Sequence, residues 1–134
     1  MPTLDTSVIV DLLRGHDRSL RAVERHVAAA KPLFVAPHTL FELYRGAFAR
    51  ASPAAEVERI EAVRAGLVVL PFDERAAREA ALIVEELGAA GTPVPERDVF
   101  IAASTMVWGD RVILTHDLEH FRRMETFGLV AERP

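Results

Sequence analysis

Cysteine is absent from this sequence of 134 residues, and acidic residues outnumber lysine and arginine by 20 to 16. The lack of cysteine excludes disulfide bonds, thiolate metal ligands and a cysteine nucleophile. The resulting net charge of -4 disfavours a protein that holds nucleic acid only by neutralising phosphates, because such proteins are usually basic on at least one face. It does not disfavour an enzyme that reaches phosphates through metal ions, whose carboxylates must gather where the cations bind.

Long hydrophobic runs are also missing, since none approaches the roughly 20 residues that a membrane-spanning helix needs. The first residues include Asp5 and Asp11 and lack the basic start of a signal peptide. We therefore expect a soluble, cytoplasmic protein with no membrane partner. The length suits one compact domain, and no linker, repeat or low-complexity tract divides it, so a single domain over residues 1–134 is predicted.

Short apolar runs alternate with longer amphipathic stretches along the chain. Strands are predicted at residues 2–5, 33–36, 67–70, 111–115 and 129–131. Apolar residues at helical spacing predict helices at residues 6–15, 18–30, 37–48, 53–65, 73–90, 98–108 and 117–121. This alternation, with strands that are apolar throughout, predicts a three-layer α/β/α fold around a mostly parallel sheet of about five strands.

Four acidic residues could meet at one edge of the predicted sheet. Asp5 and Asp117 follow two of the strands, whereas Asp98 begins a helix and Glu42 lies inside one. In parallel sheets, ligands bind beyond the carboxyl ends of the strands. Clustered carboxylates repel one another, and Mg²⁺ or Mn²⁺ relieves that repulsion while leaving positions for a phosphate oxygen and an attacking water. The pattern therefore suggests a divalent metal site.

Each of these acids also has a purely structural explanation. Asp5 and Asp117 are suited to cap a helix, and capping alone explains either of them better than catalysis does. Asp98 would be a favourable charge in a first helical turn, and Glu42 could pair with Arg45 one turn on; for these two the explanations are even. Four separate structural roles need not converge on one edge of a sheet, so their joint placement favours the metal site.

The residues around these acids resemble the motifs of the PIN-domain family. Residues 4–9 (LDTSVI) are similar to the family's opening strand and Asp-Thr-Ser segment, and residues 41–46 (FELYRG) to its second motif. Residues 98–103 (DVFIAA) resemble the third motif, and residues 114–121 (LTHDLEHF) the fourth. The four segments occur in the family's order over essentially the whole chain. The Leu-Arg-Gly at residues 13–15 also suits the VapC branch of the family.

The resemblance implies a PIN-like fold and a metal-dependent endoribonuclease that cleaves structured RNA with metal-activated water. It assigns the catalytic role to four acids, namely Asp5, Glu42, Asp98 and Asp117. Asp5, Asp98 and Asp117 would hold Mg²⁺ or Mn²⁺, with Glu42 as a ligand or a partner of the attacking water. The fourth motif matches least closely, and either Asp117 or Glu119 could supply its acid.

Two further sets of side chains accompany these acids. The hydroxyl groups of Thr6, Ser7 and Thr115 are candidates to orient carboxylates or waters through hydrogen bonds. The candidates for contacts with RNA phosphates are Arg14, Arg45 and Arg97. For each of these arginines, a solvated helix charge that balances nearby acids is at least as good an explanation.

The resemblance also implies partners. It predicts a homodimer that acts as the toxin of a toxin–antitoxin pair, silenced by a VapB-like antitoxin whose tail fills a groove leading to the acidic pocket. Apolar residues of the first two predicted helices, Leu12, Leu13, Leu20 and Val23, could form part of that groove. Packing against their own sheet is the default explanation for residues at this spacing.

Two alternatives remain open from the sequence. Residues 116–120 (HDLEH) match the inverted His-x-x-Glu-His pattern of a zinc peptidase, in which two histidines one helical turn apart share Zn²⁺. The short predicted helix and the few residues after His120 argue against it. The other alternative is a non-catalytic PIN-like module that binds RNA or protein, which metal-dependent cleavage would exclude.

Overall fold

The computed structural model describes all residues, 1–134, and contains one sheet of five strands in the order β3-β2-β1-β4-β5. The strands are β1 (Thr3–Leu4), β2 (Phe34–Val35), β3 (Val68–Val69), β4 (Val112–Leu114) and β5 (Val130–Glu132). Every neighbouring pair is parallel, so the predicted mostly parallel sheet of about five strands is confirmed. The last strand extends to Glu132, one residue beyond its predicted end, because Thr115 N bonds the Glu132 carbonyl.

Seven α-helices and one short 3-10 turn connect the strands. The helices are α1 (Thr6–Arg14), α2 (Asp17–Ala28), α3 (Pro37–Phe48), α4 (Pro53–Ala65), α5 (Glu74–Ala89), α6 (Glu96–Trp108) and α7 (Leu118–Arg122), and the turn is η1 (Glu125–Phe127). Gly15 ends α1 in a left-handed conformation with φ of 73°, which glycine adopts without steric penalty. None of the helices is both long enough and apolar enough to cross a bilayer.

Several helix ends differ from the prediction by one or two residues, and two of these differences have a clear local reason. Helix α6 begins at Glu96 rather than Asp98, because the carbonyl of Pro95 accepts hydrogen bonds from the backbone N–H of Asp98 and Val99. Proline is tolerated at this end of a helix, where an N–H has no intrahelical partner. Helix α7 begins one residue after Asp117, because Asp117 is its N-cap and accepts a bond from the backbone N–H of His120.

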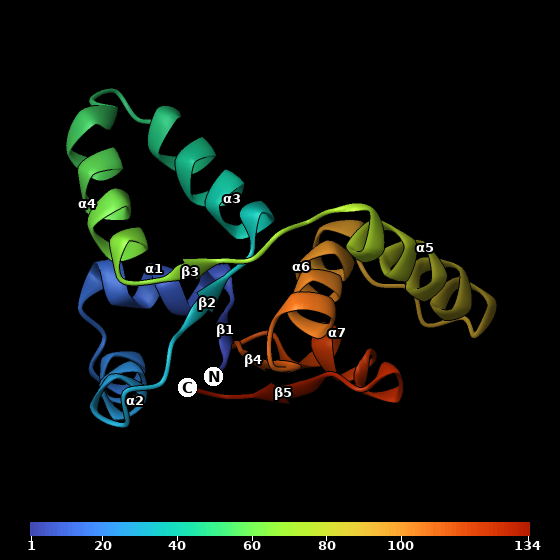
Figure 1. Ribbon diagram of the computed structural model, residues 1–134. Coiled ribbons are helices and arrows are strands. Elements are labelled where there is room, and N and C mark those ends of the chain that lie inside the picture. The colour runs from blue at the N-terminus through green and yellow to red at the C-terminus, as the bar shows by residue number, and fades with distance from the viewer.

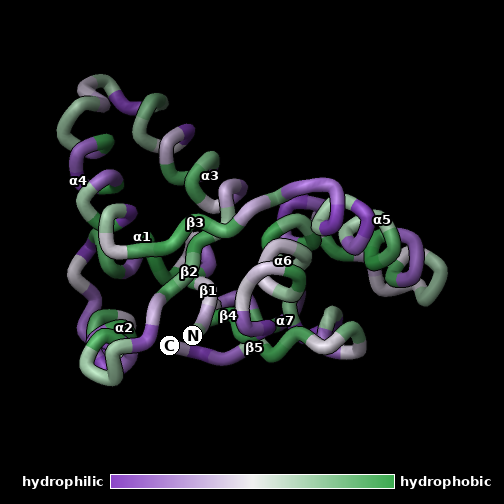
Figure 2. The backbone as a smooth tube through the Cα atoms, viewed as in Figure 1, coloured by the Kyte–Doolittle hydropathy of each residue, from purple (hydrophilic) through white to green (hydrophobic).

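Helices cover both faces of the sheet and bury a separate apolar core on each. On one face, Leu4, Val35 and Leu114 pack with residues of α1, α3 and α4. On the other face, Ile113 and Ala131 pack with residues of α5, α6 and α7. Figure 1 shows the sheet lying between these two groups of helices. In Figure 2 the hydrophobic colour runs along β2 and β3, whereas the outer helices alternate between hydrophilic and hydrophobic segments.

Strand order reverses between β1 and β4. From β1 the chain continues outward to β2 and β3, and then returns to the other side of β1 to form β4 and β5. The backbone N–H of Asp5, directly after β1, donates to the carbonyl of Leu114 at the end of β4, at 3.0 Å. After β1 the chain enters α1 on one face of the sheet, and after β4 it enters α7 on the other face; such a switch point is where open α/β sheets bind their ligands.

Candidate active site

The four acids identified in the sequence come from four elements that meet beyond the carboxyl ends of β1 and β4. Asp5 directly follows β1, and Asp117 lies in the segment after β4. Glu42 lies in α3 and Asp98 in the first turn of α6. The negative charges of Asp5, Glu42 and Asp98 act on one another, and Asp98 and Asp117 share a histidine partner. The fold therefore brings together residues from both ends of the chain.

The charge of Asp5 conflicts with its buried environment. It is 7% exposed, and its Oδ2 accepts hydrogen bonds from Thr115 Oγ1 at 2.7 Å and Ser7 Oγ at 3.3 Å. Burial raises the pKa of Asp5 above its usual value, and the charge of Asp98 raises it further, against the lowering effect of the hydrogen bonds. A cation nearby would therefore stabilise the charged form of this carboxylate.

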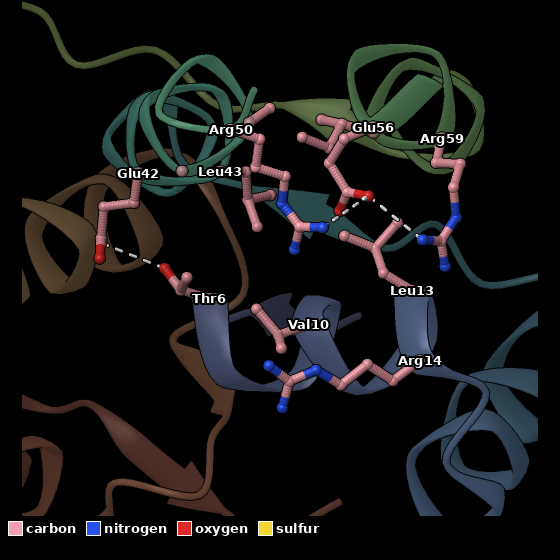
Figure 3. Close-up of a pocket in the computed structure, with 12 residues that line it drawn as sticks. Thr6, Val10, Leu13, Arg14, Glu42, Leu43, Arg50, Glu56 and Arg59 are labelled. Atoms are coloured by element: carbon pink, nitrogen blue, oxygen red, sulfur yellow. Dashed lines mark hydrogen bonds and ion pairs between the residues drawn. The ribbon is translucent and has the colours of Figure 1, made fainter. Parts of the chain in front are cut away.

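Glu42 is held by one hydroxyl and one guanidinium. Thr6 Oγ1 donates to Glu42 Oε1 at 3.1 Å, the bond drawn at the left of Figure 3, and Arg97 Nη1 lies 3.2 Å from Glu42 Oε2. Burial raises the pKa of Glu42; Arg97 opposes that effect, and the charges of Asp5 and Asp98 add to it. The ion pair of Glu42 with Arg45 that local spacing suggested is not formed.

Asp98 and Asp117 converge on the imidazole of His120. Its Nδ1 lies 2.8 Å from Asp98 Oδ2 and 2.9 Å from Asp117 Oδ2. Asp98 is 4% exposed, whereas the side chain of Asp117 is 42% exposed. Because Asp117 also caps the start of α7 through its Oδ1, its structural and functional explanations are compatible: one oxygen caps the helix and the other faces His120.

Glu119, the alternative fourth acid, points elsewhere. Its side chain is 75% exposed and pairs with Arg123 at 3.1 Å, one helical turn further along α7. The acid that shares His120 with Asp98 is Asp117. The geometry therefore favours Asp117 over Glu119 as the fourth acid of the pocket.

The three candidate hydroxyl groups each donate to one of the acids. Thr6 donates to Glu42, while Ser7 and Thr115 donate to the same oxygen of Asp5. The latter two also accept backbone bonds: Ser7 Oγ from the N–H of His116 at 3.1 Å and Thr115 Oγ1 from the N–H of Asp117 at 2.9 Å. The bond from Thr115 to Asp5 and the bond from the His116 N–H to Ser7 tie the segment after β4 to the start of α1.

The three arginine candidates differ in their contacts. Arg97 bridges two acids, with its Nη1 on Glu42 and its Nε 3.7 Å from Asp98 Oδ1. Arg45 is exposed and lines a shallow hollow beside Glu42 and Arg97. Arg14 is exposed on α1 and lines a cleft that also contains Thr6 and Glu42 (Figure 3). Arg14 and Arg45 are thus free of ion pairs, whereas Arg97 is engaged by the acids.

The cleft of Figure 3 runs between α1, α3 and α4, and α2 contributes none of its lining residues. Of the four apolar residues expected to line a groove on the first two helices, only Leu13 does so. Leu12 and Val23 pack against the core of their own face of the sheet, and Leu20 is 40% exposed outside the cleft. Leu12 and Val23 thus follow the default explanation, and α3 and α4, rather than α2, complete this cleft with α1.

The zinc-peptidase alternative does not fit the positions of its two histidines. His116 lies before α7, and its Nε2 contacts Asp11 of α1. His120 lies within α7 and faces Asp98 and Asp117. The two imidazoles therefore have different acidic partners and do not form the pair on one helix that the pattern requires.

The residues present fit a divalent cation. One ligand atom each from Asp98, Asp117 and His120 lies within 4.8 Å of the others, and burial raises the pKa values of the buried Asp5 and the half-buried Glu42. Oxygen ligands of this kind suit Mg²⁺ and Mn²⁺. The contact of His120 with the acids was missed from the sequence. The available signal was its position three residues after Asp117, which places both side chains on one side of a helical turn.

Comparisons with known proteins place these features in context. A family model described as PIN domain matches residues 3–126. Ribonuclease VapC2 of Haemophilus influenzae is 27% identical over 121 residues, which cover 90% of this chain and 89% of that protein. The structure of DNA-bound VapBC from Salmonella typhimurium contains a chain with a TM-score of 0.85 and 29% identity, covering 99% of this chain and 98% of the other. For VapBC2 from Rickettsia felis, bound to a promoter DNA fragment, the TM-score is 0.87 at 18% identity, with 98% and 97% covered.

Proposed function

The chain belongs to the PIN-domain family, and from this premise we propose that it is a divalent-metal-dependent endoribonuclease, the toxin of a VapBC-type pair. The observation that carries the proposal is the convergence of Asp5, Glu42, Asp98 and Asp117 beyond β1 and β4. Similarity to a protein named ribonuclease VapC2 supports RNA as the substrate. The proposed domain is a single PIN domain that spans residues 1–134, and its substrate is structured RNA in the cytoplasm.

In this proposal Asp5, Asp98 and Asp117 would hold Mg²⁺ or Mn²⁺. When bound, the ion supplies Lewis acidity, which makes water a better nucleophile and neutralises charge that develops on the phosphate oxygens. The chain's residues orient the reacting groups. Thr115 and Ser7 fix the rotamer of Asp5 through their hydrogen bonds, and Glu42, positioned by Thr6, accepts a hydrogen bond from the attacking water.

The arginines supply contacts with the RNA backbone. Arg14 and Arg45 flank Glu42 on the cleft and the neighbouring hollow, where their guanidinium groups can bind phosphates on either side of the cleaved bond. Arg97 has to exchange its bonds to Glu42 and Asp98 for a phosphate before it can do so. These arginines would place positive charge beside the RNA although the whole chain carries a net charge of -4.

The proposed partner is a VapB-like antitoxin. Solved structures of similar chains are described as VapBC complexes, two of them bound to DNA, which supports an antitoxin for this chain as well. The cleft between α1, α3 and α4 leads from apolar residues such as Leu13 and Ile60 to Glu42 at the acidic pocket. An antitoxin segment that follows this path would block the acids. We further propose that the toxin forms a homodimer.

The proposal is tested by incubating a pool of structured RNAs with purified protein freed of antitoxin, in Mg²⁺, Mn²⁺ or EDTA. Asp5→Asn and Asp98→Asn remove a charge from the pocket, and Asp17→Asn, at an exposed position of α2, is the matched control. We expect cleavage with Mg²⁺ or Mn²⁺, none in EDTA, and a loss of at least about 100-fold in both pocket variants. The control should cleave as the wild type does.

Other outcomes separate the competing explanations. Cleavage that survives both pocket substitutions would refute the proposed site. A folded protein that binds structured RNA, but neither cleaves any RNA nor gains thermal stability from either ion, would favour the non-catalytic binding module. Thermal stabilisation by metal should be about 2.7 kcal/mol at an ion concentration 100 times Kd, and the two pocket variants should show less of it.

A further inference from the structure

His120 is the one imidazole among the side chains that contact the four acids. It lies in α7, whose first turn is ordered by the cap from Asp117, and its ring is 31% exposed. Two carboxylates of different elements, Asp98 and Asp117, approach the same nitrogen, Nδ1, at 2.8 and 2.9 Å. The Nδ1 nitrogen of His120, which can bind a metal ion, therefore lies between two of the acids that are proposed to hold it.

The spacing of these three atoms matches that of neighbouring ligands around one ion. Ligands about 2.1 Å from an octahedral ion are about 3.0 Å apart when they occupy adjacent positions. The distances from Nδ1 to the two carboxylate oxygens are close to that value, and all three atoms fall within 4.8 Å of one another. The same contacts also suit a hydrogen on Nδ1 shared between the two carboxylates, so the two arrangements must be separated by experiment.

From this geometry we propose that His120 Nδ1 is a ligand of the divalent ion, and that this nitrogen gives the site a preference for Mn²⁺ or another first-row transition metal over Mg²⁺. The proposal rests on the proposed function and specifies its metal. Mg²⁺ is a hard cation that favours oxygen, whereas imidazole binds first-row transition metals well. A site built only of carboxylates would lack this discrimination.

The direct test is pulsed electron paramagnetic resonance of the metal-free protein reloaded with one equivalent of Mn²⁺, which detects ¹⁴N nuclei bonded to the ion. We expect modulation from one imidazole nitrogen in the wild type and none in His120→Asn. His116→Asn is the matched control, because His116 is four residues away but contacts Asp11 instead. Its spectrum should keep the nitrogen modulation.

Calorimetric titration with Mn²⁺ and with Mg²⁺ tests the preference independently. In His120→Asn, the ratio of the Mn²⁺ affinity to the Mg²⁺ affinity should fall by about tenfold or more, since even hydrogen-bonding partners of a metal ligand are worth about 10- to 100-fold in affinity. His120→Asp replaces nitrogen by carboxylate oxygen, and it should shift the preference toward Mg²⁺ while binding remains measurable. This second variant tests the preference if His120→Asn weakens the fold.

The outcomes distinguish the metal ligand from the proposed function. Mn²⁺ that binds in an Asp98-dependent way, but without nitrogen modulation, would overturn the role of His120 and leave the nuclease proposal intact. A nitrogen signal that persists in His120→Asn would assign the ligand to another residue and overturn it too. Mn²⁺ binding that is absent, or unchanged in Asp98→Asn, would overturn both proposals.

Discussion

Thr115 donates its hydroxyl hydrogen to Asp5 across the boundary between β4 and β1, at a distance of 2.7 Å. The two residues are 110 positions apart, and they meet because Leu4 and Leu114, which precede them, are paired in the parallel sheet. The same hydroxyl oxygen accepts the backbone N–H of Asp117. A single fully buried side chain therefore positions two of the four acids.

Replacing Thr115 by valine, which has nearly the same shape, removes both hydrogen bonds. It leaves the Asp117 N–H without its acceptor and leaves Asp5 with Ser7 as its only side-chain donor. We expect the free energy of unfolding to fall by about 1–3 kcal/mol, the cost of leaving such groups unpaired, as measured by urea denaturation. Thr115→Ser keeps the hydroxyl and should recover most of the loss. A valine variant as stable as the wild type would contradict this role.

The carboxylates of Asp5 and Glu42 should each lower the stability of the metal-free protein as pH rises from acidic to neutral. The pKa values of Asp5 and Glu42 are raised in the folded state by burial, so the folded protein binds more protons than the unfolded chain between the unfolded and folded pKa values. The stability that these two groups contribute is then fully present below the unfolded pKa, about 4, and is lost as pH rises through the folded pKa. With a divalent ion bound, this loss should shrink.

Asp5→Asn isolates the contribution of one of these groups, because it removes the charge and retains an oxygen that accepts from Thr115. In EDTA, thermal melting of this variant and the wild type should coincide near pH 4 and diverge above it, with the variant more stable at pH 7. A difference of 1 kcal/mol would appear as roughly 4 °C in a domain of this size. A variant less stable than the wild type at pH 7 would contradict the assigned direction.

Arg97 should compete with metal ions for the acids. Its guanidinium lies on both Glu42 and Asp98, and Arg97→Gln would remove this internal cation. Because Arg97 is 56% exposed, solvent screening limits such a pair to about 1 kcal/mol or less, so divalent affinity should rise about two- to fivefold. Arg45→Gln removes the same charge from a neighbouring residue without an ion pair and should change affinity less. Unchanged or weaker metal binding in Arg97→Gln would refute this competition.

The local pattern of apolar and polar residues was sufficient to predict the strands and helices and to identify the candidate acids. Strands that are apolar throughout and helices with one apolar stripe reflect burial on two faces or on one, so the alternation predicted a parallel sheet with helices on both sides. Asp5 and Asp98 could be placed near strand or helix ends because turn and cap residues mark those ends. The predicted start of a helix differed from the observed one where Pro95 and Asp117 are the N-cap residues.

Only the tertiary structure decided which side chains meet. The local rule paired Glu42 with Arg45, but Arg97 is its partner because α3 and α6 pack together and one guanidinium there reaches two carboxylates. His120 reaches Asp98 because α7 packs against α6, a contact that its spacing from Asp117 along the chain does not contain. Periodicity specifies which face of an element is buried, whereas the register between distant strands determines what that face touches. The sequence by itself thus determined the fold class and the candidate acids, and the packing of the sheet and helices determined the geometry of the pocket.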